Sequence, residues 1–128
     1  MFEQDYIMRL IKEVIRMILK ILFNIDTESP ITEFVHEKEE KNVVLNELLD
    51  MIDSGQINEA ENRIYTMMEN KEDHALETAF IFYEYLNDKD DEFLKNHDFS
   101  REEVINGVKY LTSQCGMESV FDIFFPKA

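Results

Sequence analysis

Turn-forming and cross-linking residues are scarce in this chain of 128 residues, which contains three glycines, two prolines, one cysteine and no tryptophan. A β-sandwich or β-barrel needs a turn signal about every ten residues, so the shortage argues against both folds. The single cysteine, Cys115, cannot form an internal disulfide, which is typical of a reducing compartment. Because 45% of the residues are hydrophobic, a disordered or low-complexity chain is also excluded.

Basic side chains are also few. Thirteen Lys and Arg stand against 28 Asp and Glu, which gives a formal net charge of −15. A charge of this sign repels phosphate backbones, so we expect no nucleic acid among the partners. The length is that of a single domain, and residues 1–128 are predicted to fold as one unit.

Long hydrophobic runs are absent as well. In the most apolar segment, residues 1–23, no uninterrupted apolar run exceeds three residues, whereas a membrane-spanning helix needs about twenty apolar residues. A secretory signal peptide begins with basic residues, but this chain opens with Glu3 and Asp5. We therefore expect a cytoplasmic protein, peripheral to a membrane at most.

Residues 3–23 are predicted to form one long amphipathic helix. At 100° per residue, its polar side chains from Asp5 to Asn24 fall within an arc of about 120°, and nearly all the others are apolar. Five apolar side chains follow the alternating four–three spacing of a coiled-coil seam: Ile7, Ile11, Val14, Ile18 and Ile21. The apolar face is about twice as wide as that of an ordinary surface helix, so we expect it to be covered from two sides.

The rest of the chain shows helical spacing of apolar residues without strand-like alternation. The predicted elements are a helical hairpin over 43–70, helices over 75–86 and 100–115, and a short helix over 117–125. Residues 31–41 are expected to form a short helix or a loop. The sequence therefore predicts an all-α fold of five or six antiparallel helices, in which Phe121, Phe124 and Phe125 belong to the core.

Local signals mark two of the predicted helix ends. Gly55 is placed to end the first hairpin helix in a left-handed conformation, and Ser100 and Glu103 have the spacing of a capping box. Residues 88–92, which are rich in acids, are expected to form a solvated connection, followed by about one helical turn at Phe93 and Leu94.

The hairpin segment Leu48–Glu61 resembles the middle of a tetratricopeptide repeat, in which a glycine-containing turn joins two closely packed helices. Gly55 and Ala60 match that pattern, although no second copy follows 34 residues later. The opening FEQDYIMRLIKEVIRMILKILF, and the chain as a whole, resemble a family of small helical bacterial proteins without an assigned activity. This resemblance implies an all-helical fold and brings no catalytic motif.

Motifs for metal binding or catalysis are incomplete. Glu33 and His36 have the Glu-x-x-His spacing of di-iron carboxylate bundles, but the second motif is missing. The run that starts at Asp88 begins like a calcium loop and then lacks its turn glycine and final acid. Cys115 stands at a predicted helix end, where a thiolate is disfavoured, so we expect a half-buried packing thiol. We predict no catalytic, cofactor-binding or metal-binding residues, and a protein that is not an enzyme.

The basic edge of the first helix departs from the acidic background. Residues 1–23 carry a net charge of +1, which leaves −16 for the other 105 residues. The leading hypothesis is an interaction module that forms a homodimer, or binds another protein, through this helix. Its predicted contact residues are the five seam residues Ile7, Ile11, Val14, Ile18 and Ile21, with the basic residues Arg9, Lys12, Arg16 and Lys20. The alternatives are a peripheral membrane protein that uses the same helix, an enzyme that uses acidic residues, and a mimic of nucleic acid.

Overall fold

The computed structural model describes residues 2–25 and 43–126, and every regular element in these ranges is an α-helix. The helices are α1 (Phe2–Phe23), α3 (Val43–Asp53), α4 (Ile57–Glu69), α5 (Ala75–Asn87), α6 (Asp91–Asn96), α7 (Arg101–Gln114) and α8 (Glu118–Phe124). The all-α prediction is confirmed. The described ranges contain seven helices, more than the five or six predicted, because α6 forms where only one turn within a connection was expected.

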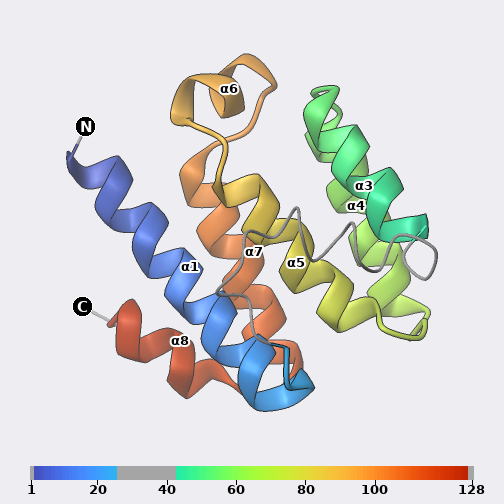
Figure 1. Cartoon of the computed structure of the whole chain (residues 1–128), viewed down its shortest axis with the longest axis vertical. Coiled ribbons are helices and arrows are strands. Elements are labelled where there is room, and N and C mark those ends of the chain that lie inside the picture. The colour runs from blue at the N-terminus through green and yellow to red at the C-terminus, as the bar shows by residue number, and fades with distance from the viewer. Residues whose placement is uncertain (1, 26–42, 127–128) are drawn as a thin grey trace.

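Helix α5 occupies the centre of the molecule (Figure 1). The α3–α4 hairpin packs on one side of it, and α1 and α7 pack on the other side, where α8 closes against both of them. Helix α5 is buried around nearly its whole circumference, as expected for a helix whose sequence is apolar on all faces. Its largest fully buried side chains, Phe80, Phe82 and Tyr83, form the middle of the core.

The turn between α3 and α4 requires a glycine for two reasons. Gly55 has a φ of +83°, in the left-handed region that glycine adopts without steric cost, as the sequence predicted. A Cβ atom at this position would also stand 2.2 Å from Cδ2 of His97, so the hairpin turn lies directly against the end of α6. In the hairpin itself, Ala60 is fully buried.

Polar caps begin two of the helices. The Oγ atom of Ser100 accepts a hydrogen bond from the backbone N–H of Glu103 at 3.2 Å, which confirms the predicted cap of α7. Asp90 caps α6 in the same way by accepting from the N–H of Phe93 at 2.8 Å. Asp90 is exposed, as predicted for a solvated connection, and the prediction was wrong only in placing Asp91 and Glu92 in that connection, because both belong to α6.

Helix α8 places its aromatic residues against the core. Phe121 is buried, and its ring stacks on that of Phe125 with the centroids 4.9 Å apart. Phe124 and Phe125 are half-buried and pack against the core cluster. Phe121 thus lies in the core as predicted, whereas Phe124 and Phe125 are only partly buried there. Residues 31–41 and the Glu33–His36 motif lie outside the described residues.

Candidate interaction surface

Helix α1 divides its apolar residues between the core and the surface. Ile11, Val14 and Ile18 have no exposed surface within a single chain, because α5, α7 and α8 cover that side of α1. These three residues were predicted to contact a second copy, and their burial in the chain's own core makes them unavailable to one. Of the predicted seam, Ile7 is half-buried and Ile21 is 58% exposed.

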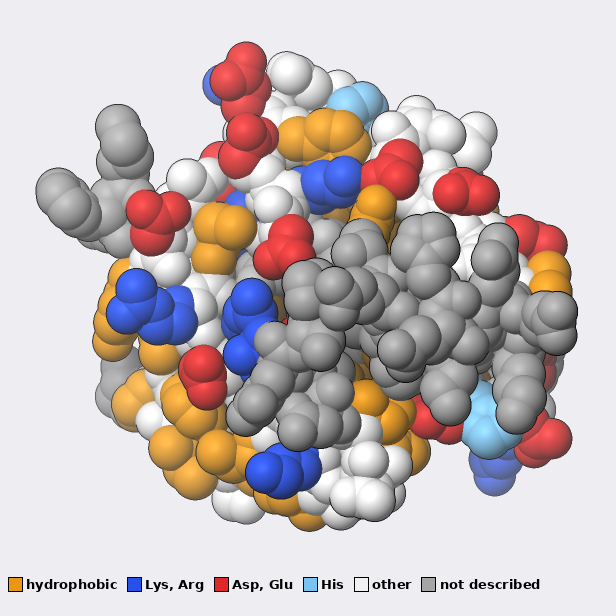
Figure 2. All heavy atoms as spheres, in the orientation of Figure 1, with side chains coloured by type: hydrophobic (Ala, Val, Ile, Leu, Met, Phe, Trp, Pro, Cys, Tyr) orange, Lys and Arg blue, Asp and Glu red, His pale blue; other side chains and the backbone are white. Residues whose placement is uncertain are grey.

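A different set of α1 side chains is left uncovered. Tyr6 is 61% exposed and Met17 is 37% exposed, and together with Ile21 and the partly buried Leu10 they fall within about 60° of helical arc. We call Tyr6, Leu10, Met17 and Ile21 the α1 stripe. Figure 2 shows apolar side chains gathered over the α1–α8 side of the molecule.

The basic residues of α1 lie along one edge of the stripe. Arg9 and Lys20 are exposed, and Lys12 and Arg16, farther round the helix towards α5, are half-buried. Lys and Arg side chains are visible beside the apolar region in Figure 2. The four predicted basic residues thus belong to one side of the helix, as their spacing indicated. Only Arg16 has an ion pair: its Nε lies 3.7 Å from Oε1 of Glu84 on α5.

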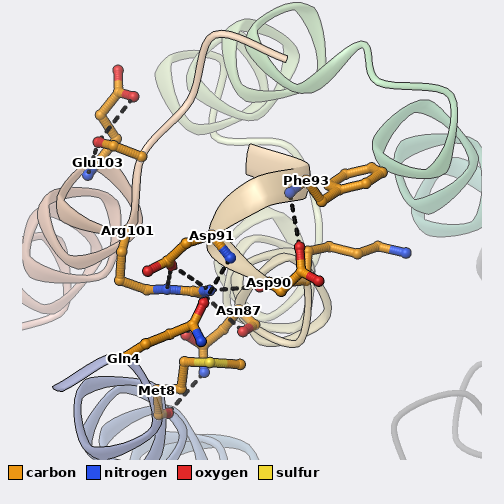
Figure 3. A network of polar contacts seen from close by, with 10 residues as sticks. Gln4, Met8, Asn87, Asp90, Asp91, Phe93, Arg101 and Glu103 are labelled. Atoms are coloured by element: carbon orange, nitrogen blue, oxygen red, sulfur yellow. Dashed lines mark hydrogen bonds and ion pairs between the residues drawn. The ribbon is translucent and has the colours of Figure 1, made fainter. Parts of the chain in front are cut away.

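A network of polar contacts joins α1, α5, α6 and α7 at the end of the molecule near α6 (Figure 3). The guanidinium of Arg101 donates to the carbonyl oxygen of Asn87 at 2.8 Å and to Oδ1 of Asp91 at 3.1 Å. Asn87 in turn donates from Nδ2 to the carbonyl of Met8 at 2.8 Å, and the N–H of Asp91 donates to Oε1 of Gln4 at 2.7 Å. Because its donors and acceptors are matched, we interpret the network as structural.

A second buried polar group lies between α4, α5 and α7. The hydroxyl of Tyr83 donates to Oε2 of Glu61 at 2.7 Å. Burial raises the pKa of Tyr83, and the neighbouring Glu61 adds to the effect. Burial also raises the pKa of Glu61, although the hydrogen bond from Tyr83 opposes this rise. Tyr65 also interacts with Tyr83, and the negative charge of Glu103 adds to the rise in the pKa of Glu61.

The described residues also include one cysteine and a small cavity where α3 begins. Cys115 is half-buried, burial raises the pKa of its thiol, and its Sγ lies 3.6 Å from the carbonyl oxygen of Thr112. This is the packing role expected from the sequence. A cavity of about 210 Å³ lies where α3 begins, and it is lined by residues that include Val43, Val44, Met67 and His74. Its volume falls below the roughly 300–1,000 Å³ of typical small-molecule sites.

Residues 2–25 and 43–126 contain no group of three or more His, Cys, Asp and Glu side chains placed to hold a metal ion. Within the same part of the chain, no helix combines the length and apolar character needed to cross a bilayer. The exposed large apolar side chains of the described residues lie on three helices, and α1 carries more of them than the other two: Tyr6, Met17, Ile21 and Leu22 on α1, Val43 and Val44 on α3, and Ile123 on α8.

Comparison with known proteins adds a family to this description. The model of a family of unknown function, DUF6483, matches residues 1–116. The chain belongs to this family. No curated protein and no solved structure matches the chain.

The DUF6483 match spans α1 to α7 and so includes the α1 stripe, its basic edge and the Glu84–Arg16 pair. Helix α8, which follows the matched range, packs against both α1 and α7. The family that the sequence resembled, small helical proteins without an assigned activity, agrees with this finding.

Sequence reasoning missed Glu84, the polar residue that is most unusual in its surroundings. It is 3% exposed and stands in the segment Phe80–Leu86, where its neighbours are aromatic or aliphatic. One acid within such a run on a fully buried helix is itself a signal. Because the chain contains 28 Asp and Glu residues, this one acid did not stand out in the sequence.

Proposed function

We propose that this protein is a small interaction module that self-associates through the α1 stripe. The observation that carries the proposal is the division of α1: its core side is complete within one chain, and Tyr6, Met17 and Ile21 still remain exposed. Large apolar side chains grouped on a surface helix are typical of protein–protein contacts, and aromatic residues and Met are enriched at such interfaces.

The distribution of charge along the chain supports a second copy of the same chain as the partner that binds the α1 stripe. The basic edge of α1 belongs to a segment of net charge +1, and the remaining 105 residues carry −16. A second copy therefore offers an acidic surface to Arg9 and Lys20, while in a two-fold arrangement the two stripes meet near the symmetry axis. The same charge makes nucleic acid an unsuitable partner.

Further parts of the proposal rest on local resemblance and composition. Gly55 in the turn and buried Ala60 in the contact support a tetratricopeptide-like role for the hairpin, as a rigid scaffold beside α5. The single cysteine supports a cytoplasmic location. The proposed activity is binding, without catalysis.

The experiment is a measurement of solution mass by light scattering on a sizing column. We expect the wild type to exceed the 15.3 kDa of one chain and the double variant Met17→Glu, Ile21→Glu to fall to it. Val43→Glu is the matched control, because Val43 on α3 is 58% exposed, the same fraction as Ile21, and lies outside the stripe. This control should keep the mass of the wild type.

A wild-type mass of one chain at high protein concentration would overturn the proposal, as would a double variant of unchanged mass. Sedimentation with phosphatidylserine vesicles tests whether a lipid membrane, and not a second copy of the chain, covers the α1 stripe. If the wild type is a single chain and co-sediments at low salt, whereas the double variant does not, the stripe binds lipid and the self-association proposal is wrong.

A further inference from the structure

The carboxyl group of Glu84 is buried between α5 and α1 without a hydrogen-bond donor. Its side chain is 4% exposed, and neither Oε1 nor Oε2 has a hydrogen-bond partner. The nearest cation is Arg16, whose Nε lies 3.7 Å from Oε1, beyond hydrogen-bond range, and this Nε is itself buried without a partner. These are the three unpartnered buried side-chain atoms in the described part of the chain.

The contrast with Arg101 shows how unusual this arrangement is. Arg101 is also nearly buried, and its guanidinium has acceptors on Asn87, Lys89 and Asp91. A buried carboxylate normally requires such partners, because removing the charge from water is costly. The ionised form of Glu84 has none within range, whereas the neutral form carries no charge to compensate.

The charged groups that act on Glu84 come from two helices. Arg16 and Lys12 on α1 favour the ionised form, and Asp88, one turn farther along α5, disfavours it. Burial is the largest effect and raises the pKa of Glu84 to about 7.

On each of the other three helices that pack on α5, one charged residue contacts a partner other than Glu84. Asp53 of α3 contacts Tyr85 and Lys89, Glu61 of α4 contacts Tyr83, and Arg101 of α7 contacts Asn87 and Asp91. The charge state of Glu84 is therefore governed by the contact between α1 and α5.

We propose that Glu84 is a proton-operated latch between α1 and α5. With the proton on its carboxyl group, Glu84 packs as a neutral side chain and α1 lies closed on α5. When the proton passes to water, the carboxylate draws in water or the Arg16 guanidinium, and this loosens the packing of α1. The latch acts between two helices of one chain, so it can be present whether or not the chain self-associates.

The direction of the pH effect follows from linkage. The pKa of Glu84 is higher in the folded chain than its ordinary value of 4.5, so the folded chain binds the additional proton between these two values. Across that window the stability contributed by Glu84 falls as the pH rises. Above about pH 7 the full cost of the buried charge is present, and it acts on the α1–α5 contact.

The experiment measures amide hydrogen exchange, resolved by helix and corrected for intrinsic exchange rates, at pH values from 5 to 9. In the wild type we expect protection of α1 to fall by up to about tenfold for each pH unit from pH 5 to the midpoint near pH 7, and to level off above it. The closed chain keeps the Glu84 proton up to this midpoint, whereas the opened chain has already released it. Helices α3 and α4, which do not pack on α1, should change little. Glu84→Gln, which cannot ionise, should keep the protection of α1 independent of pH.

Two further variants test the latch even if Glu84→Gln fails to fold. Asp88→Asn removes a charge that raises the pKa and should move the midpoint to lower pH, whereas Arg16→Met removes one that lowers it and should move the midpoint to higher pH. The proposal is overturned if α1 protection in the wild type is constant with pH or if every helix loses protection equally. Equal midpoints in the two variants would overturn it as well.

Discussion

Gly107 of α7 lies so close beneath the ring of Tyr83 that a Cβ atom at residue 107 would stand 2.4 Å from Cζ of the tyrosine. The ring cannot easily retreat, because Tyr83 has no exposed surface and its hydroxyl is bonded to Glu61 at 2.7 Å. The absence of a side chain at residue 107 therefore lets α7 approach α5 and leaves space for the buried tyrosine.

Gly107→Ala should lower the free energy of unfolding by about 2 kcal/mol, because the added methyl group overpacks the core. Helix propensity alone predicts the opposite sign, a gain of about 1 kcal/mol. Urea unfolding followed by circular dichroism distinguishes the two. The control is Asn106→Ala, which introduces alanine at an exposed position of the same helix and should be neutral or slightly stabilising. A more stable Gly107→Ala would contradict the packing described here.

Ile11→Glu combined with Ile18→Glu should unfold the chain and not merely dissociate an assembly. Both side chains have no exposed surface, and two unpaired buried charges cost several kcal/mol, comparable with the 5–15 kcal/mol that stabilises typical domains. Far-UV circular dichroism should show loss of helix in this variant, whereas Met17→Glu with Ile21→Glu should keep the wild-type spectrum. A folded Ile11, Ile18 variant would mean that these residues do not belong to the core.

Arg101→Lys should lower stability by roughly 2 kcal/mol even though the positive charge is kept. One ammonium group cannot reach the acceptors on Asn87, Lys89 and Asp91 together, and those left behind lose their partner at a partly buried site. Arg63→Lys is the matched control. Arg63 pairs with Glu47 at 2.7 Å on the surface, where the exchange should cost less than about 1 kcal/mol. If the denaturation midpoints shift equally in both variants, the contacts of Arg101 with Asn87, Lys89 and Asp91 do not contribute as described.

Tyr85 should ionise at a higher pH than an exposed tyrosine. Burial, together with the hydrogen bond to Asp53, raises the pKa of Tyr85 to about 12 from its ordinary value of 10. Since a raised tyrosine pKa favours the neutral folded form, its contribution to stability is complete below pH 10 and is lost towards pH 12. Tyr85→Phe should therefore remove an absorbance step near pH 12 in a spectrophotometric titration. An unchanged titration curve would place the ionisation at another residue.

The helices were predictable because their signals are local. Apolar spacing located α1, the hairpin and α7 to within about two residues, Gly55 marked a turn, and Ser100 marked a cap. Each of these depends on residues only a few positions apart, and such patterns are visible without knowledge of the fold.

The candidate surface was predictable only in part. Helical angles identified the apolar and basic sides of α1, but the same pattern is produced whether the cover comes from a partner or from α5, α7 and α8 of the same chain. Ile11, Val14 and Ile18 were therefore assigned to an interface, whereas the structure places them in the core. Contacts such as Gly107 with Tyr83 and Arg16 with Glu84 join residues 24 or 68 positions apart, beyond the reach of a local pattern.

The position of α1 against α5, α7 and α8 has a consequence during synthesis. Helix α1 leaves the ribosome before any of the helices that cover it, and the first of them, α5, begins at residue 75. At roughly 5–20 residues per second, the apolar side of α1 waits for several seconds without its cover. A nascent chain in this interval has the features that chaperones bind, and it exposes the same Ile11 and Ile18 that the finished molecule hides completely.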